Sequence, residues 1–344
     1  MDHVGDQVET ALPDSDKRVD VDVAVVGAGP AGLYAAYCAG FRGLSCAVVD
    51  SLPHPGGQIS ALYPEKNIYD VAGHAVVRGR ELVDNLVRQV APFEPHYLLG
   101  TTATSLTPSQ EAGWTIELDG GGRIHAQAVV IAAGLGRSTP RTLDCLRPYE
   151  GRGVAYHVPR LEEHRGRDVV IVGGGDSAVD WALALAPLAR CVTVVHRRSE
   201  FRAHPHSVKQ MYAADIRVLT DARVTECNGA GRLEDIRIRA GDEEMKLPAQ
   251  ALVAALGFIT NLGPIGGWGL TVENHRIVVD RAMRTNLPRV YAVGDICHYE
   301  GRVPLISVGF GDAATAANHA AVDLRPGSRL APEHSTDRDT ALLP

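Results

Sequence analysis

The sequence predicts an α/β fold with two Rossmann-like dinucleotide-binding domains, one inserted into the other. A strand, a glycine turn, a helix and a second strand follow one another over residues 21–50, where a β-branched run leads into GAGPAG. The same order restarts over residues 168–196, around GGGDSA. A buried strand that ends in glycine follows each pattern, at 128–134 and at 251–257. The repeat indicates two parallel sheets, each with a nucleotide-type turn at the carboxyl end of a strand.

The first glycine turn has the spacing of a pyrophosphate-binding loop. Gly27 lets the chain turn, Gly29 lets backbone amides approach a pyrophosphate, and Gly32 lets the helix pack on the strand. The N-terminus of that helix then faces the phosphates. Asp50 stands about 20 residues further on, where a carboxylate accepts a hydrogen bond from a ribose hydroxyl. The first unit therefore suits an unphosphorylated ribose, such as that of FAD.

The second unit has basic residues where the first has its acid. His196, Arg197 and Arg198 stand at the position equivalent to Asp50, and Arg202 follows. A carboxylate there would repel an adenosine 2′-phosphate, whereas guanidinium groups bind a phosphate through pairs of parallel hydrogen bonds. The second unit is therefore predicted to bind NADPH. The alternative for this basic run is a solvated surface.

The last part of the chain is expected to return to the first domain. A strand at 289–293 delivers Asp295 to a loop, and a small-residue helix is expected at 312–321. These elements need the partner strands of the first domain, so the second domain is an insertion and its two covalent crossings make a hinge. The predicted organisation is a mobile tail at 1–18, an FAD-binding domain at 19–137 and 284–344, and an NADPH-binding domain at 138–283.

Residues 51–73 are too rich in proline and glycine for a regular element, and they are expected to form a ligand-contacting loop. Gln58 and Tyr63 are its notable members. For Tyr63, the alternative is an aromatic ring that only packs over the loop. An amphipathic helix is expected at 75–92, followed by short strands at 96–101, 114–118 and 124–126.

Composition narrows the class of protein. A length of 344 residues favours about two domains, and 45% hydrophobic with 22% charged residues is ordinary for a globular protein. The net charge of −7 argues against a nucleic-acid binder, and no apolar run reaches the ~18 residues that a membrane span needs. The N-terminus has no apolar core of a signal peptide. The six cysteines form neither a CxxC pair nor a metal-ligand spacing, so we expect a cytoplasmic protein without a metal site.

Across residues 20–337 the chain resembles the two-dinucleotide flavoproteins that include thioredoxin reductase. Within them it is most similar to the bacterial, thioredoxin-reductase-like ferredoxin–NADP⁺ reductases. The motifs that carry the resemblance are GAGPAG, GGQISALYPEKNIYDVAG, GGGDSAVDWAL, HRRSEFRAH, GDICHYEG and a late HST. Thioredoxin reductases carry a redox CxxC in the NADPH domain, and this chain has none. The resemblance therefore implies the ferredoxin-reducing branch.

The resemblance also implies roles for particular residues. Tyr63 would stack on one face of the isoalloxazine, and His334, from the same or the partner subunit, would cover the other face; neither is assigned an acid or base role. Ser138 departs from the pattern, because relatives often have an aromatic residue there. The residues expected to bind FAD are Gly27, Gly29, Pro30, Ala31, Gly32, Asp50, Gly57, Gln58, Tyr63, Ala103, Asp295 and Thr336. Those expected to bind NADP are Gly173, Gly175, Asp176, Ser177, Ala178, His196, Arg197, Arg198 and Arg202.

The implied activity is that of an FAD-dependent ferredoxin–NADP⁺ oxidoreductase, usually a homodimer in this family. NADPH would pass a hydride to the flavin, which would deliver single electrons to ferredoxin or flavodoxin. One alternative is an NADPH-dependent quinone or disulfide reductase on the same scaffold, although the missing CxxC counts against a disulfide substrate. Another is a flavin-binding sensor that never turns over.

Overall fold

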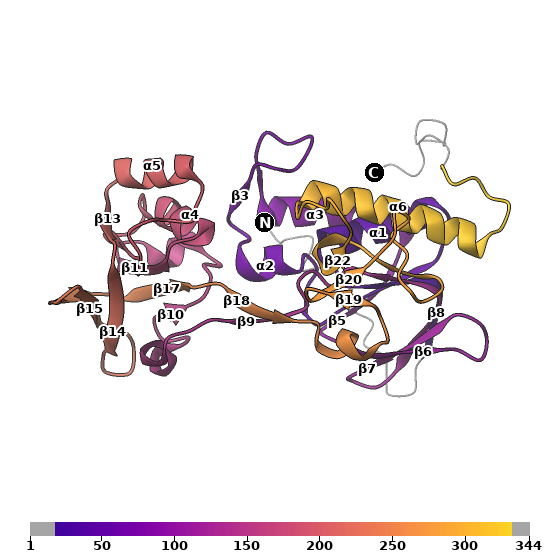
Figure 1. Ribbon diagram of the computed structural model, residues 1–344, viewed down its shortest axis with the longest axis horizontal. Coiled ribbons are helices and arrows are strands. Elements are labelled where there is room, and N and C mark those ends of the chain that lie inside the picture. The colour runs from indigo at the N-terminus through magenta and orange to yellow at the C-terminus, as the bar shows by residue number, and fades with distance from the viewer. Residues whose placement is uncertain (1–17, 332–344) are drawn as a thin grey trace. The chain divides into compact units, whose positions relative to one another are not determined.

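The structure of the chain is a computed structural model, and it describes residues 18–331. The chain divides into two compact units (Figure 1). Of the described residues, the first unit comprises 18–61, 67–137 and 260–331, and the second comprises Leu62–Lys66 and Ser138–Ile259. The first unit thus resumes at Thr260, whereas the sequence placed the return at residue 284.

The first unit is built on a sheet that the glycine turn adjoins. Its parallel part contains β5 (His96–Leu99), β2 (Cys46–Asp50), β1 (Arg18–Val26) and β8 (Arg123–Ile131), in that order. Strand β21 (Val290–Ala292) pairs in parallel with the last residues of β8. The chain leaves the carboxyl end of β1 directly into the first glycine turn, which is where ligands bind in open α/β sheets.

The other half of this sheet is antiparallel. The N-terminal part of β8 pairs with β7 (Trp114–Leu118), which pairs with β6 (Ala103–Pro108). The sequence predicted two short strands where β8 is one continuous strand, and it did not predict β6. Strand β6 is an edge strand in which only Ala103 and Leu106 are buried, so it lacks a strong apolar pattern.

Three helices of this unit pack together beside the sheet (Figure 1). They are α1 (Pro30–Phe41), α3 (Gly79–Val90) and α6 (Ile306–Leu324). Helix α6 begins at Ile306, before the predicted start at residue 312, and it therefore contains Gly309. A Cβ on Gly309 would lie 3.5 Å from both the Ala31 Cβ and the Gly294 Cα, an ordinary van der Waals contact, which places this part of α6 beside the start of α1.

The second unit repeats the parallel arrangement. Its sheet contains β10 (Val154–Ala155), β17 (Ala251–Ala255), β11 (Asp168–Gly173), β12 (Cys191–Val195) and β13 (Ile216–Leu219), in that order. Successive side chains of a strand point to opposite faces. Accordingly Val169 and Ile171 enter one apolar cluster, beneath α4 (Asp176–Leu185) and α5 (Pro205–Ala213), and Val170 and Val172 enter a second cluster on the other face.

An antiparallel sheet covers that second face. It contains β14 (Ala222–Asn228), β15 (Asp235–Ala240) and β16 (Glu243–Pro248). The side chains of Val224, Ile236 and Ile238 fill the cluster from this side.

Short elements complete the described chain. The two connections between the units, β9 (Arg137–Pro140) and β18 (Phe258–Asn261), pair with each other as strands. The segment expected to be irregular contains α2 (Gln58–Leu62) and β3 (Asn67–Ile68). The remaining elements are β4 (Val77–Arg78), β19 (Val272–Glu273), β20 (Arg276–Val278), β22 (Cys297–His298) and the 3-10 helices η2 (Ala91–Phe93), η3 (Asp144–Tyr149), η4 (Leu161–His164), η5 (Gly263–Gly267) and η6 (Gly294–Ile296). Over residues 18–331, no helix is both long and apolar enough to cross a membrane.

Candidate cofactor-binding sites

Packing requires glycine at the first and third positions of the first turn. Gly27 has a φ of +112°, and a Cβ there would lie 2.4 Å from the carbonyl oxygen of Ala132. A Cβ on Gly32 would lie 1.9 Å from the carbonyl oxygen of Gly27. Both distances are far below a van der Waals contact, so neither position accepts a side chain without moving the backbone.

The middle glycine of this turn has room for a side chain, with one neighbour at an ordinary van der Waals distance. The nearest atom to a Cβ on Gly29 would be the Cα of Gly57, at 4.0 Å. Gly57 has a φ of +55°, and a Cβ on it would lie 2.9 Å from the Gly29 Cα. Two glycine loops therefore approach each other through bare backbone at the start of α1. Gly29 caps that helix without a side-chain hydrogen bond, and Pro30 is its first residue. The first N–H groups of a helix have no partner within it, which leaves those of this turn for a ligand.

Asp50, at the end of β2, is tied to the same turn. One carboxylate oxygen accepts a hydrogen bond from the Ala28 N–H at 2.6 Å, and the other accepts from the Leu52 N–H at 2.9 Å. Burial raises the pKa of Asp50, and these two N–H groups act in the opposite direction. Each oxygen of a carboxylate has more than one acceptor position, so Asp50 retains capacity to accept from a further hydroxyl.

A buried ionic network holds the loop that contains Asp295. Asp312 of α6 accepts hydrogen bonds from the Arg302 Nε at 3.1 Å, from the Tyr299 hydroxyl at 3.0 Å and from the Gly294 N–H at 3.3 Å. The side chains of Arg302 and Asp312 are only 2% and 3% exposed. Arg302 also reaches Asp295, with 3.4 Å between Nη1 and Oδ1. Sequence reasoning selected Asp295 but neither Arg302 nor Asp312, because no spacing marks them.

In the second glycine turn, one glycine faces open space and its neighbours do not. A Cβ on Gly173 would lie 2.4 Å from the carbonyl oxygen of Ala255, and one on Gly174 would lie 2.1 Å from the His196 ring. A Cβ on Gly175 would meet nothing within 4 Å. Gly175 caps α4 without a side-chain hydrogen bond, so the open position again coincides with a helix N-terminus.

The side chain of His196 packs against Gly174 of this turn. Its side chain is buried, its Nε2 lies 3.1 Å from the carbonyl oxygen of Glu200, and its ring stacks on Phe201 with centroids 5.0 Å apart. Burial lowers the pKa of His196, the hydrogen bond to the Glu200 backbone acts in the opposite direction, and the charges of nearby Arg198 and Arg197 lower the pKa further. The ring is therefore neutral near pH 7 and fills the space beneath Gly174.

The loop after β12 is fastened to the glycine turn by its backbone. The Arg202 N–H donates to the Gly174 carbonyl oxygen at 2.8 Å, and the His204 N–H donates to Asp176 Oδ1 at 2.8 Å. Arg197, Arg198 and Arg202 are exposed. The structure thus brings three exposed guanidinium groups onto the loop that adjoins the open glycine.

The other predicted site residues are distributed as follows. Ala31, in α1, is half-buried beside Gly294. Gln58 begins α2, and its Nε2 would lie 3.3 Å from a Cβ on Gly134. Ala103 is buried at the start of β6. In α4, Ser177 is exposed and Ala178 is buried. Tyr63 belongs to the short segment grouped with the second unit, where it packs against that unit's apolar cluster. His334 and Thr336 lie outside the described residues.

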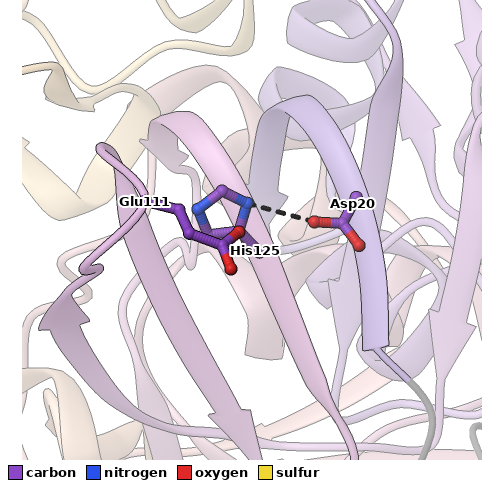
Figure 2. A group of neighbouring side chains, drawn as sticks. All are labelled: Asp20, Glu111 and His125. Atoms are coloured by element: carbon purple, nitrogen blue, oxygen red, sulfur yellow. Dashed lines mark ion pairs between the residues drawn. The ribbon is translucent and has the colours of Figure 1, made fainter.

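A further group of charged side chains in the first unit is formed by Asp20, Glu111 and His125 (Figure 2). His125 Nδ1 lies 3.2 Å from Asp20 Oδ1 across the paired strands β1 and β8. The Arg18 guanidinium donates to both carboxylates, so part of their negative charge is already compensated. The cluster sits at the amino-terminal part of β1, opposite the end that leads into the glycine turn. We assign it no cofactor role.

Comparison with known proteins identifies the family. Residues 21–320 match the family model described as pyridine nucleotide-disulphide oxidoreductase. A ferredoxin–NADP reductase of Salinispora tropica is 55% identical over 320 residues, covering 92% of this chain and 99% of the relative. One from a Nocardioides species is 52% identical over 326 residues, covering 94% and 99%. The solved thioredoxin reductase of T. acidophilum has a TM-score of 0.75 and 26% identity, covering 88% of this chain and 98% of that one.

These matches confirm the predicted fold class of two Rossmann-like dinucleotide-binding domains, and they confirm the resemblance and the oxidoreductase assignment. They extend over nearly the full length of both chains, so they concern the complete two-unit arrangement and not one glycine motif. The chain belongs to the pyridine nucleotide-disulphide oxidoreductases and, within them, to the bacterial ferredoxin–NADP reductases.

Proposed function

We propose that this reductase binds FAD in its first unit and NADPH in its second, and that it passes electrons between NADPH and ferredoxin or flavodoxin. The observation that carries the proposal is the difference in charge between the two glycine turns: a carboxylate adjoins the first, and arginines adjoin the second. Asp50 is bonded to the first turn, and Arg197, Arg198 and Arg202 adjoin the second.

The first turn fits the adenosine half of FAD. The bare backbone at Gly29 and Gly57 leaves room for a pyrophosphate, and the start of α1 offers N–H groups and a favourable dipole to it. Asp50 would accept from a ribose hydroxyl, and Asp295, held by Arg302, would accept from the polyol chain. Pro30, Ala31, Gln58 and Ala103 would complete the contacts. The first unit would then be the FAD-binding domain and the second unit the NADPH-binding domain.

The second turn fits NADPH. Gly175 and the N-terminus of α4, with Ser177, would face the pyrophosphate. Arg197, Arg198 and Arg202 would bind the 2′-phosphate, since guanidinium groups form paired, charge-assisted hydrogen bonds to phosphate. Neutral His196 would act by supporting Gly174 and orienting the arginine loop, not by touching phosphate.

A bound flavin would take up the two electrons of NADPH as a hydride and pass them singly to an iron–sulfur protein. The chain's own residues would position the reactants and exclude water from the reacting atoms. Tyr63 and, from the C-terminal segment, His334 and Thr336 would cover the isoalloxazine. No described side chain is assigned a proton-transfer role. We further propose a homodimer that works in the cytoplasm.

An acceptor panel tests this proposal. The purified enzyme is supplied with NADPH and, in parallel, with ferredoxin, flavodoxin, a quinone or a disulfide, and NADPH oxidation is followed. Ferredoxin or flavodoxin should support the fastest turnover. Brisk turnover with a quinone and none with either electron carrier would favour the quinone reductase alternative. Turnover with the disulfide alone would favour a disulfide reductase, and no turnover with any acceptor would favour a flavin-binding sensor.

A further inference from the structure

Two cysteines that are distant in the sequence meet in the second unit. Cys145 lies in η3, Cys227 lies in β14, and these two elements pack against each other. Both side chains are half-buried against the same apolar cluster, and their thiol groups are hydrogen-bonded to each other. The sequence contains no CxxC motif, so this pair is created by the fold.

The hydrogen bond between the two thiols separates their acidities. It lowers the pKa of Cys145 to about 7 and raises that of Cys227. One proton is in effect shared, since a thiolate at Cys145 is stabilised by the Cys227 S–H. The thiolate is the reactive form of cysteine, so Cys145 combines partial exposure with a substantial reactive fraction near pH 7.

We propose that Cys145 and Cys227 form a peroxide-oxidisable dithiol whose disulfide fastens η3 to β14. In the first step the Cys145 thiolate attacks a peroxide oxygen, the O–O bond breaks, and Cys145 becomes a sulfenic acid while hydroxide leaves. In the second step the Cys227 sulfur attacks the Cys145 sulfur and the S–O bond breaks. The proton of the Cys227 thiol and the departing hydroxyl leave together as water. Overall, two thiols are oxidised by two electrons and the peroxide is reduced.

The other cysteines have different surroundings. Cys38, Cys46 and Cys297 are buried, and burial raises the pKa of each to about 12. Such thiols are inert toward peroxide near neutral pH. Cys191 is the exposed cysteine, at the start of β12, and it serves as the internal reference for accessibility. Cys145 and Cys227 belong to neither glycine turn, and their oxidation is measured without electron transfer from NADPH.

The test uses the full-length holoenzyme, first reduced and then treated with a small excess of hydrogen peroxide. Remaining thiols are alkylated under denaturing conditions, and peptides are analysed by mass spectrometry with and without a reductant. We expect a Cys145–Cys227 linked peptide that the reductant abolishes. In untreated native enzyme at pH 7, Cys145 should alkylate roughly tenfold faster than the more exposed Cys191.

Matched variants separate the two roles. Cys227→Ser should leave Cys145 as a sulfenic acid that dimedone traps, whereas Cys145→Ser should give neither the linked peptide nor dimedone labelling at Cys227. Cys191→Ser should form the linked peptide as the wild type does. The linked peptide is measured in the wild-type enzyme, so the test does not depend on the folding of a variant. Its absence there, or alkylation of Cys145 no faster than that of Cys191, would overturn the proposal.

Discussion

Asp312→Ala should destabilise the first unit strongly. The variant removes the buried carboxylate partner of Arg302 and leaves only the weaker contact with Asp295, which is 41% exposed and lies 3.4 Å away. Arg302 is 2% exposed, and among the described side chains its Nη2 already has no hydrogen-bond partner. The substitution therefore leaves a buried guanidinium nearly uncompensated.

The magnitude follows from the burial. Removing one member of a buried ion pair costs about 3–5 kcal/mol, because the desolvated charge stays behind. The hydrogen bonds from Tyr299 and Gly294 are lost as well, at about 1 kcal/mol each, although these losses overlap with the first. We expect a decrease of about 4 kcal/mol in the free energy of unfolding, which is a large share of the stability of a typical domain.

Guanidinium chloride unfolding followed by circular dichroism measures this change. The exposed Glu111→Ala serves as the control, since Glu111 also pairs with an arginine of the first unit but in solvent, and its transition midpoint should stay that of the wild type. The double variant Arg302→Met, Asp312→Leu should recover most of the loss, because apolar groups can replace a buried pair without penalty. An unfolding free energy for Asp312→Ala within about 1 kcal/mol of the wild-type value would refute the reasoning. A solvent-exposed ion pair contributes about that much, so a loss this small would mean that the pair behaves as an exposed one.

Three further outcomes are expected. Arg197→Ala and Arg198→Ala should each weaken apparent NADPH affinity by roughly tenfold to a hundredfold, since a charge-assisted hydrogen bond contributes about 1.5–3 kcal/mol. The use of NADH should stay nearly unchanged. An unaltered preference for NADPH over NADH would contradict the assignment of the second site. Arg190→Ala should lower stability at pH 7, because its hydrogen bonds lower the pKa of Asp168. A carboxylate whose pKa is lowered in the folded state stabilises that state at pH values above its unfolded pKa. The difference in unfolding free energy between variant and wild type should therefore disappear as the pH falls below about 4. A difference that stays constant with pH would contradict this role of the Arg190–Asp168 pair. Ferredoxin reduction should slow with rising ionic strength more steeply than ferricyanide reduction, since transient redox partners are steered by charge; equal slopes would exclude such steering.

Much of the fold was predictable because glycine turns and buried parallel strands leave strong local patterns. The strand that ends at Asp50 and the one over Cys191–Val195 were placed nearly to the residue. Helix α6 was predicted too short, because its glycines disfavour a helix unless tertiary packing demands them. Strand β6 was missed because an exposed edge strand has few buried residues to form a pattern.

The site was predictable only where a residue has a fixed offset from a motif. Asp50 and Arg197 stand at such offsets. Arg302 and Asp312, by contrast, are brought together from a loop and a helix interior, and Cys145 and Cys227 from two elements far apart in the chain. His196 occupies a motif position, yet its burial beneath Gly174 depends on the shape of the following loop, which no sequence pattern specifies.

Anaerobic rapid mixing with NADPH, followed by ferredoxin, tests whether this chain links a two-electron donor to a one-electron carrier. NADPH, and NADH far more slowly, should bleach the visible flavin absorption of the enzyme. Oxidised ferredoxin added next should restore that absorption, with two ferredoxin molecules reduced for each NADPH consumed, because each carrier takes one electron. A flavin that NADPH bleaches but that neither ferredoxin nor flavodoxin reoxidises at low salt would contradict the proposed electron path.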